Sequence, residues 1–319
     1  METKQMQATA ESIRNNIERV MLGKAEVIDL VLTCLIAGGH VLLEDVPGTG
    51  KTMLAKSLAK SLDTDFKRIQ FTPDLLPTDL IGLNYYNPKT GDFSFRKGAL
   101  FTSILLADEI NRATPRTQSS LLESMEEKQI TVDGVTYTLN ASYFVIATQN
   151  PVETQGTFPL PEAQLDRFLM KLSLGYPNAA DSVNVIKRFT TSSPLESLAP
   201  VCAEAALAEL QAAARQVFVH DDVAAYVVAI AEETRKHELV SLGLSTRGIL
   251  ALVRAAQAWA LTHGRAFVTP DDVKALAPYV VGHRLLLRSG SRNRETAVRG
   301  VLEDILSAVP VPTENFANE

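Results

Sequence analysis

The chain is poor in cysteine and in long hydrophobic stretches. Its two cysteines, Cys34 and Cys202, lie in apolar helical patterns without the spacing of metal ligands, so we expect neither a disulfide framework nor a zinc site. No stretch approaches the roughly 18 consecutive apolar residues of a membrane-spanning helix. The polar N-terminal residues also lack the apolar core of a signal peptide. Together these absences favour a protein of the reducing cytoplasm with no membrane span.

An excess of basic charge is also absent. The formal net charge is −6 and the isoelectric point is near 5.5, whereas proteins that bind nucleic acids usually carry a basic footprint. Nucleic acid is therefore disfavoured as a partner. What is present is the composition of an ordinary globular protein, with 46% hydrophobic and 21% charged residues. A length of 319 residues predicts two domains, or one large domain with a small partner.

The most informative stretch is residues 39–58, in which an apolar strand runs into a glycine-rich turn and then a helix. Glycines in such a turn let consecutive backbone N–H groups point into one concavity, and the positive end of the following helix dipole favours an anion there. The stretch therefore predicts a phosphate-binding loop. The alternative, a chance Gly-Lys-Thr between a loop and a helix, is weakened by the strand before it and the helix after it.

The residues of this loop have predicted roles toward a nucleotide and its metal. Lys51 is expected to reach the β- and γ-phosphates, and the hydroxyl of Thr52 to hold a Mg²⁺ ion that bridges them. The general pattern G-x-x-x-x-G-K-S/T has glycine where this chain has Asp45, which is tolerable if that position does not need a positive φ angle. We expect ATP to contact Asp45, Val46, Pro47, Gly48, Thr49, Gly50, Lys51, Thr52 and Met53.

Two helices are predicted before the loop, over residues 8–20 and 26–37, because apolar residues recur there at helical spacing. The first ends at Gly23, and the second ends in consecutive glycines. A helix–glycine–helix entry of this kind often closes over the adenine base, so Gly23 is a candidate nucleotide contact. Simple N-terminal packing explains the same pattern equally well.

A carboxylate pair, Asp108 and Glu109, directly follows the apolar run 103–107, which is typical of a central parallel strand. Because ligands bind at the carboxyl ends of strands in open α/β sheets, the pair should lie beside the phosphate loop. Asp108 is then expected to hold the Mg²⁺ shell, and Glu109 to orient and deprotonate the attacking water. Gln70, near the end of a second predicted strand over 66–71, could touch the same machinery.

Two further polar residues lie at the ends of later predicted strands. Asn150 comes at the tip of a strand over 143–147, where its amide could bind a γ-phosphate oxygen or the water, although turn propensity before proline explains it equally well. Arg167 precedes the last predicted strand, over 171–174. An arginine that points out of the ligand-bearing edge could act on the γ-phosphate of a neighbouring subunit. The alternative is a surface salt bridge.

Two insertions interrupt the predicted α/β pattern. Residues 75–98 carry several aromatics around a Lys89-Thr90-Gly91-Asp92 turn, which suggests a small hairpin that contacts a partner or lines a pore. Residues 128–139 are predicted to form a second hairpin, turned by Asp133-Gly134. A hairpin placed before a core strand should project from the domain.

The chain beyond residue 190 is rich in alanine and predicted to be almost entirely helical. Helices are expected over residues 181–189, 203–217, 221–235, 246–263 and 269–283. We therefore expect an α/β domain over residues 1–190 and a small helical domain over residues 191–319. Arg247, at the start of one helix, could reach back over the nucleotide as a second sensor of the γ-phosphate, or simply face solvent. The histidines show no metal-ligand grouping.

These motifs together resemble those of the MoxR family of AAA+ ATPases, which is related to the ATPase subunit of magnesium chelatase. The segments that carry the resemblance are GGHVLLEDVPGTGKT, RIQFTPDLLPTDLIG, LLADEINRATPRTQSSLLESMEE, FVIATQNPVETQGTFPLPEAQLDRF and STRGILALVRAAQAWALTHGRAFVTPDDV. They occur in the right order and span most of the chain. The resemblance implies an α/β fold, in which a P-loop AAA+ parallel-sheet αβα domain is followed by a small all-α lid domain.

The resemblance also implies a role for each candidate residue. The assignments are Walker A at Lys51 and Thr52, Walker B at Asp108 and Glu109, sensor 1 at Asn150, an arginine finger at Arg167 and sensor 2 at Arg247. Residues 75–98 match the helix-2 insert and residues 128–139 the pre-sensor hairpin, and both are expected to face the central opening of a ring. Asp45 agrees with the MoxR version of the loop. Arg112 and Arg116 are further candidates for the trans-acting role.

For function, the resemblance implies an ATPase that forms a ring, usually a hexamer, and hydrolyses ATP with Mg²⁺. It would remodel or activate partner proteins in a chaperone-like way, often ones with a von Willebrand factor A domain. Two alternatives stay open. One is a chelatase-type ATPase subunit that serves metal insertion, and the other is a nucleic-acid motor, which the acidic charge disfavours.

Overall fold

The computed structural model describes residues 3–89, 91–152, 155–190, 193–288, 294–313 and 316. The helices are α1 Thr3–Glu18, α2 Ala25–Ile36, α3 Lys51–Ser61, α4 Pro77–Ile81, η1 Ile110–Arg112, α5 Pro115–Glu127, α6 Glu162–Leu165, α7 Ala179–Phe189, α8 Glu204–Ala214, α9 Asp221–Lys236, α10 Thr246–Thr262, α11 Pro270–Val280, η2 Gly282–Arg284 and α12 Arg294–Ala308. The strands are β1 Val41–Glu44, β2 Phe66–Gln70, β3 Gly82–Asn87, β4 Asp92–Lys97, β5 Ile104–Asp108, β6 Gln129–Val132, β7 Val135–Thr138, β8 Phe144–Gln149, β9 Met170–Leu172, β10 Val240–Leu242 and β11 Leu286–Leu287.

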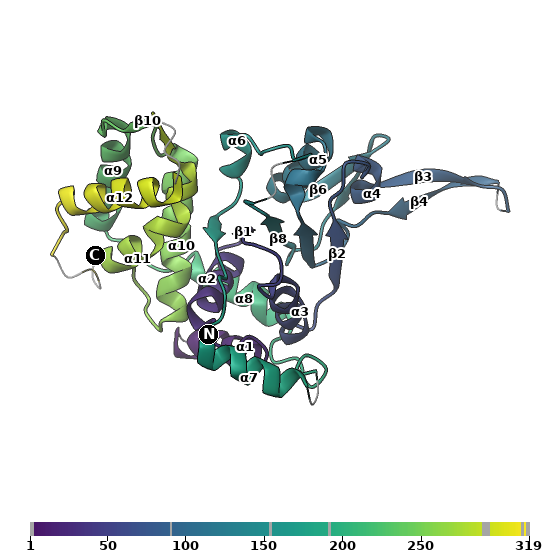
Figure 1. The fold of residues 1–319 in the computed structure, drawn as a ribbon, viewed down its shortest axis with the longest axis horizontal. Coiled ribbons are helices and arrows are strands. Elements are labelled where there is room, and N and C mark those ends of the chain that lie inside the picture. The colour runs from purple at the N-terminus through teal and green to yellow at the C-terminus, as the bar shows by residue number, and fades with distance from the viewer. Residues whose placement is uncertain are drawn as a thin grey trace.

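Five of these strands form one parallel sheet in the order β2-β5-β8-β1-β9 (Figure 1). Every residue of β5 is buried, as expected of a strand that is covered on both faces. Because all five strands run the same way, their carboxyl ends meet at one edge of the sheet and their amino ends at the other. These are called the carboxyl edge and the amino edge below. The apolar runs predicted as strands over 103–107 and 143–147 are β5 and β8, which begin one residue later than predicted.

Helices cover both faces of this sheet, because successive strand residues point to opposite sides. Leu106 of β5 joins a buried core with residues of α1, α2 and α3, whereas its neighbour Leu105 joins a second core with residues of α5. The predicted αβα arrangement is therefore confirmed. The strand order places the end of β8 between the loop that follows β1 and the carboxylates at the end of β5.

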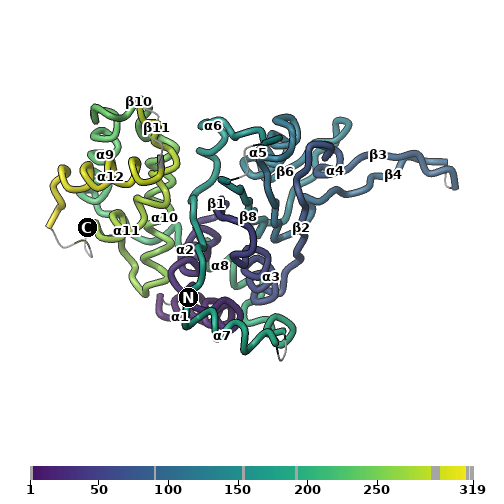
Figure 2. The backbone as a smooth tube through the Cα atoms, viewed as in Figure 1, coloured from purple at the N-terminus to yellow at the C-terminus, as the bar shows by residue number. Residues whose placement is uncertain are grey.

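The C-terminal helices α9 to α12 lie together on the β9 side of the sheet, far from β2 (Figures 1 and 2). The helices predicted over 221–235, 246–263 and 269–283 are α9, α10 and α11, while α12 and the short β10–β11 pair were not predicted. Residues 191–192, where the predicted second domain begins, lie outside the described residues, so this domain boundary stays a prediction. Within the described ranges, no helix has both the length and the apolar character to cross a membrane.

Both predicted hairpins are present, and they are joined to each other. The antiparallel pair β3–β4 forms a long arm that projects from the sheet (Figure 1), although Thr90 at its turn lies outside the described residues. The pair β6–β7 forms the second hairpin. The Phe95 and Tyr137 rings stack with centroids 4.3 Å apart, and Asn84 Nδ2 donates to Asp133 Oδ2 at 2.7 Å. The turn end of the β6–β7 hairpin thus packs against the base of the β3–β4 arm.

Candidate functional site

Asp45 anchors the phosphate loop to the segment that follows β9. Its buried carboxylate accepts hydrogen bonds from the Ser173 hydroxyl at 2.8 Å and from the N–H groups of Leu174 at 2.7 Å and Gly175 at 3.0 Å. Asp45 is not among the described non-glycine residues with a positive φ angle, so glycine is not required at this position. The carboxylate instead joins the ends of the neighbouring strands β1 and β9.

Lys51 and two glycines shape the rest of the loop. Gly48 and Gly50 have φ angles of 86° and 97°, which glycine adopts without a steric penalty. Lys51 Nζ donates to the carbonyl oxygens of Asp45 at 2.9 Å and Val46 at 3.3 Å, so its ammonium group folds back over the loop. The lysine is therefore held beside the concavity where the phosphates are expected.

The remaining predicted loop residues lie at the same edge. Thr49 is buried, whereas Pro47 is exposed at the outside of the turn. Thr52 and Met53 are half-buried in the first turn of α3, directly after the loop. Because the N–H groups of a first helical turn have no partner within the helix, this turn is a ready anion site. The structure thus brings all the predicted loop residues to the carboxyl edge.

The junction between α1 and α2 lies against the loop. A Cβ atom built on Gly50 would lie 3.3 Å from Cε of Met21, so the junction reaches the last residue before α3. Gly23 has a φ angle of +67°, which strains any larger residue, and a Cβ atom there would lie 1.9 Å from Asp181 Oδ2 and displace that carboxylate. Lys24, which the sequence patterns did not single out, donates from Nζ to three consecutive carbonyl oxygens after β9. Gly23 therefore lies beside the predicted nucleotide site, and its contact with a nucleotide stays a prediction.

Asp108 ends β5 with both carboxylate oxygens engaged. Oδ1 accepts from Thr148 Oγ1 at 2.6 Å, and Oδ2 accepts from Nη2 and Nε of Arg68 at 2.6 and 3.2 Å. These partners compensate the carboxylate for the loss of water, since its side chain is only 12% exposed. Arg68 was not predicted as a site residue. A signal for it exists, because Arg68 stands two residues before Gln70 on β2 and thus on the same face of the strand.

Glu109 has a strained backbone and a restrained side chain. Its φ and ψ angles of 56° and 52° are left-handed, a conformation that costs a non-glycine residue about 1–3 kcal/mol and is concentrated at functional sites. Its N–H donates to Thr148 Oγ1 at 2.8 Å. Its Oε2 accepts from Gln70 Nε2 at 2.8 Å and lies 3.0 Å from Nε of Arg112. Gln70 thus touches the predicted base, as expected, and Arg112 pairs with Glu109 of its own chain.

Asn150 is buried directly after β8, between the loop and the carboxylates. Its Oδ1 accepts from the N–H of Val152 at 3.1 Å, which is the turn contact that the sequence left open as an alternative role. The N–H of Asp45 donates to the carbonyl oxygen of the preceding residue, Gln149, at 3.2 Å. Asn150 is therefore beside the phosphate loop, and its role as a sensor stays a prediction.

The oxygen donors of this edge fit a magnesium ion that arrives with a nucleotide. Mg²⁺ in phosphate sites usually takes one or two protein oxygens and completes its shell with phosphates and waters. The Thr52 hydroxyl and the Asp108 carboxylate are donors of this kind. The Arg68 guanidinium contacts Asp108 Oδ2 and the Thr148 hydroxyl contacts Oδ1, so a cation at Asp108 would compete with Arg68 at Oδ2 or with Thr148 at Oδ1.

Arg167 and Arg247 lie at the amino edge, away from the phosphate loop. Arg167 precedes β9, where the Leu169 N–H donates to the carbonyl oxygen of His40 just before β1 at 2.8 Å. Strand β1 then separates His40 from Asp45 by five residues, which corresponds to about 16 Å at roughly 3.3 Å per residue. The expected locations, with Arg167 at the ligand-bearing edge and Arg247 over its own nucleotide, were therefore wrong. The reason is strand direction, because a residue before a parallel strand lies at the opposite edge from a residue after one.

The two arginines meet at Glu126 in the last turn of α5. Nε of Arg167 lies 3.1 Å from Glu126 Oε2, and Nη2 of Arg247 lies 2.6 Å from Oε1. The adjacent carbonyl oxygen of Met125 lies 3.1 Å from Nε2 of the buried His40, which fixes this end of α5 at the amino edge. Burial lowers the pKa of His40 to about 4, so its ring is neutral near pH 7. Glu126 was not predicted, and only the folded chain identifies it.

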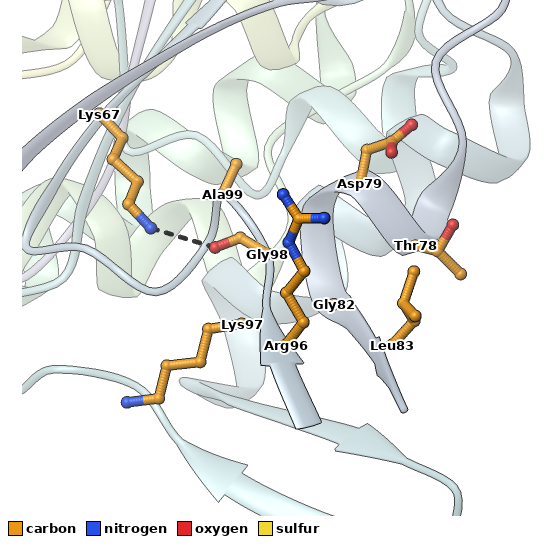
Figure 3. Close-up of a pocket in the computed structure, with 9 residues that line it drawn as sticks. All are labelled: Lys67, Thr78, Asp79, Gly82, Leu83, Arg96, Lys97, Gly98 and Ala99. Atoms are coloured by element: carbon orange, nitrogen blue, oxygen red, sulfur yellow. Dashed lines mark hydrogen bonds between the residues drawn. The ribbon is translucent and has the colours of Figure 1, made fainter. Parts of the chain in front are cut away.

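A separate hollow of about 190 Å³ lies at the base of the β3–β4 arm (Figure 3). Three cationic side chains, Lys67, Arg96 and Lys97, and one carboxylate, Asp79, line it. Figure 3 shows Lys67 Nζ donating to the carbonyl oxygen of Gly98, at 3.2 Å. A small basic surface therefore occurs at the root of the arm, although the chain as a whole is acidic.

Comparison with known proteins decides the family. The model of the ATPase family associated with various cellular activities (AAA) matches residues 40–170, and the AAA lid domain matches residues 232–305. The chain is 38% identical to Chaperone MoxR1 of Mycobacterium tuberculosis, over 96% of this chain and 83% of that protein. This chain belongs to the MoxR family of AAA+ ATPases. The family that the motifs resemble is thus confirmed.

Two further proteins are similar to this chain over nearly its full length. The Bacillus subtilis protein YeaC, which is itself uncharacterized, is 50% identical over 95% of this chain and 94% of its own. The crystal structure of an ATPase candidate from Cytophaga hutchinsonii has a TM-score of 0.89 at 35% identity and covers 98% of this chain and 97% of its own. The predicted fold class, a P-loop α/β domain with a helical lid, is therefore confirmed.

Proposed function

We propose that this MoxR-family chain hydrolyses ATP, with Mg²⁺, at sites shared between neighbouring subunits of a ring. The observation that carries the proposal is the separation of its candidate catalytic residues. Asp108 and Glu109 lie at the carboxyl edge with the phosphate loop, whereas Arg167 and Arg247 lie at the amino edge. Arginines at that distance from their own loop can act on a nucleotide only if another copy of the chain presents it.

At the carboxyl edge, different side chains bind the nucleotide and accept the proton. Lys51 exchanges the carbonyl oxygens of its own loop for the β- and γ-phosphates. Glu109 orients the attacking water and accepts its proton, and Asn150 holds the water or a γ-phosphate oxygen. When bound between Thr52 and Asp108, Mg²⁺ would neutralise negative charge on the phosphates.

The amino edge supplies the positive charge that the carboxyl edge needs during transfer. Charge spreads over the oxygens of the transferring phosphoryl group, and arginines from a neighbouring subunit stabilise it. A contact between the amino edge of one subunit and the carboxyl edge of the next joins two different surfaces, so repetition closes into a ring when the rotation allows. We propose a hexamer, as the family implies.

The ring is proposed to act on partner proteins. A relative carries the name Chaperone MoxR1, which favours protein clients over nucleic acid. The β3–β4 arm exposes Tyr86 and Phe93, which are 54% and 74% exposed, and exposed aromatics suit a protein contact. We propose that the arm touches the client, and that clients include proteins with a von Willebrand factor A domain.

The test of hydrolysis is the substitution Glu109→Gln, with Glu127→Gln as a matched change on an exposed carboxylate. Loss of a positioned general base typically lowers a rate by about 10²–10⁴. We expect Glu109→Gln to keep ATP binding, measured with a fluorescent nucleotide, and to lose phosphate release by at least about a hundredfold. Normal phosphate release by this variant would show that Glu109 is not the general base.

The same variant tests the proposed clients. A ring that binds ATP without hydrolysing it should retain a client that the wild-type protein releases. Glu109→Gln with ATP would be used to capture proteins, with ADP as the control, and bound proteins would be identified by mass spectrometry. Retention of the same proteins with ATP and ADP would argue against a nucleotide-driven cycle on those clients.

A further inference from the structure

Glu126 holds the two candidate trans-acting arginines with the two oxygens of one carboxylate. Its Oε2 lies 3.1 Å from Nε of Arg167, and its Oε1 lies 2.6 Å from Nη2 of Arg247. The arginines come from distant parts of the chain, one before β9 and one in the first turn of α10. Two cations that converge on one small anion form a site for two anionic oxygens.

Buried contacts hold in place the backbone segments that carry Arg167 and Arg247. Arg284 is 7% exposed and donates from Nε to Asp166 Oδ1 at 2.6 Å, and also to the backbone carbonyl oxygens of Asp166 and Phe168. The other carboxylate oxygen of Asp166 lies 3.2 Å from Oγ of Ser245, the residue that caps α10. The residue beside Arg167 is thus tied to the helix that carries Arg247, so the arginine pair keeps its spacing.

Another anion can replace the Glu126 carboxylate at the two arginines. The side chains of Arg167, Glu126 and Arg247 are 30%, 37% and 50% exposed. Ion pairs at such exposure are weak because water screens them, and a carboxylate carries less charge than a terminal phosphate. An anion with two oxygens and a higher charge can therefore replace Glu126 without disturbing the buried contacts of Arg284.

We propose that Glu126 is an internal substitute for the γ-phosphate of ATP bound to a neighbouring subunit. In the free subunit, Glu126 holds Arg167 and Arg247 as a pair. On assembly the two arginines exchange the Glu126 carboxylate for the neighbour's γ-phosphate, so Glu126 competes with assembly. In the free subunit, Glu126 also prevents the arginines from binding other anions. This inference rests on the proposed function, because it requires a second copy that presents ATP.

Assembly at equilibrium tests the proposal. The substitution Glu126→Gln would be placed in the Glu109→Gln background, so that ATP persists, and ring formation would be followed against subunit concentration by analytical ultracentrifugation. Release of two weak ion pairs should lower the subunit concentration at half-assembly by about threefold to tenfold with ATP. With ADP, which has no γ-phosphate, the midpoint should not change. Glu123→Gln, an exposed carboxylate one turn earlier on α5, is the matched control.

Three outcomes overturn the proposal. They are a weaker or unchanged assembly with ATP, an equal shift with ATP and ADP, and an equal shift for Glu123→Gln. A purely structural role for Glu126 would act equally with both nucleotides, so the comparison separates structure from competition. Glu126→Ala is the second variant, and thermal unfolding of each variant confirms that it folds.

A further comparison separates failure of this inference from failure of the proposed function. In a subunit that also carries Arg167→Ala and Arg247→Ala, Glu126 has lost the pair that it holds, so Glu126→Gln should no longer shift assembly. If these arginine substitutions leave ATP-dependent assembly and turnover unchanged, the trans site itself is wrong. If they impair turnover while Glu126→Gln alone has no effect, the trans site stands and only the role of Glu126 is wrong.

Discussion

The two edges of the parallel sheet carry opposite chemistry. The carboxyl edge combines a loop of backbone N–H groups with the carboxylates of Asp108 and Glu109, all placed by residues that follow strands. The amino edge presents the cations Arg167 and Arg247, one from before a strand and one from the helical part. In the proposed mechanism, nucleotide binding should therefore depend on the carboxyl edge alone, whereas turnover should depend on groups from both edges.

The edges also differ in how rigidly their groups are held. The side chain of Asp108 is 12% exposed and has partners on both oxygens, whereas that of Arg247 is 50% exposed and is ion-paired with Glu126. A site that must bind the same nucleotide in every cycle gains from a preorganised shell. Groups that must find a second subunit need room to move. The difference between the edges thus matches the proposed division into a fixed half-site and an adjustable one.

The largest predicted effect separates the role of the amino edge from that of the carboxyl edge. Arg167→Ala and Lys51→Ala should each lower ATP turnover by about 10³-fold or more, because a trans-acting arginine contributes about 10³–10⁵. Arg167→Ala should retain nucleotide binding, whereas Lys51→Ala should lose it. In a random equal mixture about one quarter of interfaces contain both intact halves, so turnover should return to about that fraction. The measurement is phosphate release against mixing ratio.

The control for this mixture is each variant mixed with itself at the same total concentration. If rings form but no mixing ratio restores turnover, Arg167 does not act in trans.

The second prediction concerns His40 at the amino edge, whose protonation should lower the free energy of unfolding at acidic pH. Nδ1 of His40 accepts from the Val145 N–H at 3.0 Å, and burial lowers the pKa of His40 from its usual 6.5 to about 4. The unfolded chain therefore takes up the proton first, so this contribution is complete above pH 6.5 and is lost as the pH falls toward 4. At pH 5 the expected loss is about 2 kcal/mol in the free energy of unfolding.

Chemical denaturation at pH 7.5 and pH 5 measures this difference. His40→Gln should reduce the difference by about 2 kcal/mol, even if it also lowers stability at both pH values. His263→Gln, at an exposed histidine, is the matched control. An unchanged pH dependence in His40→Gln would show that His40 does not resist protonation. The buried His283, whose pKa is also lowered by burial, contributes in the same direction and remains in both variants.

The smallest predicted effect concerns the carboxyl edge and tests whether Arg68 competes with Mg²⁺ for Asp108. If Arg68 competes with Mg²⁺ for Asp108, Arg68→Ala should lower the Mg²⁺ concentration needed for half-maximal nucleotide binding by about twofold to fivefold, since the pair is partly exposed. Fluorescent-nucleotide binding against Mg²⁺ concentration measures this midpoint. Lys67→Ala, on the opposite face of β2, is the control. A higher Mg²⁺ requirement would mean that Arg68 assists the nucleotide instead.

Much of the carboxyl edge was predictable because its signals are local. An apolar run followed by Asp108 identifies a strand end, and the glycine-rich turn before Lys51 identifies the loop, since each pattern needs only a few consecutive residues. The sheet then confirmed that these strand ends share one edge. Gln70 was expected near the catalytic residues for the same reason, and it donates to Glu109.

The sequence by itself determined which residues stand at the ends of strands, but only the tertiary structure decided which distant side chains meet. Arg68 with Asp108 and Glu126 with both arginines are pairs between elements far apart along the chain, and no periodicity links them. The location of Arg167 was mistaken because a short segment does not show the edge from which it enters the sheet. Local patterns arise from the geometry of one element, whereas these contacts depend on strand order and on how the helical part packs against β9.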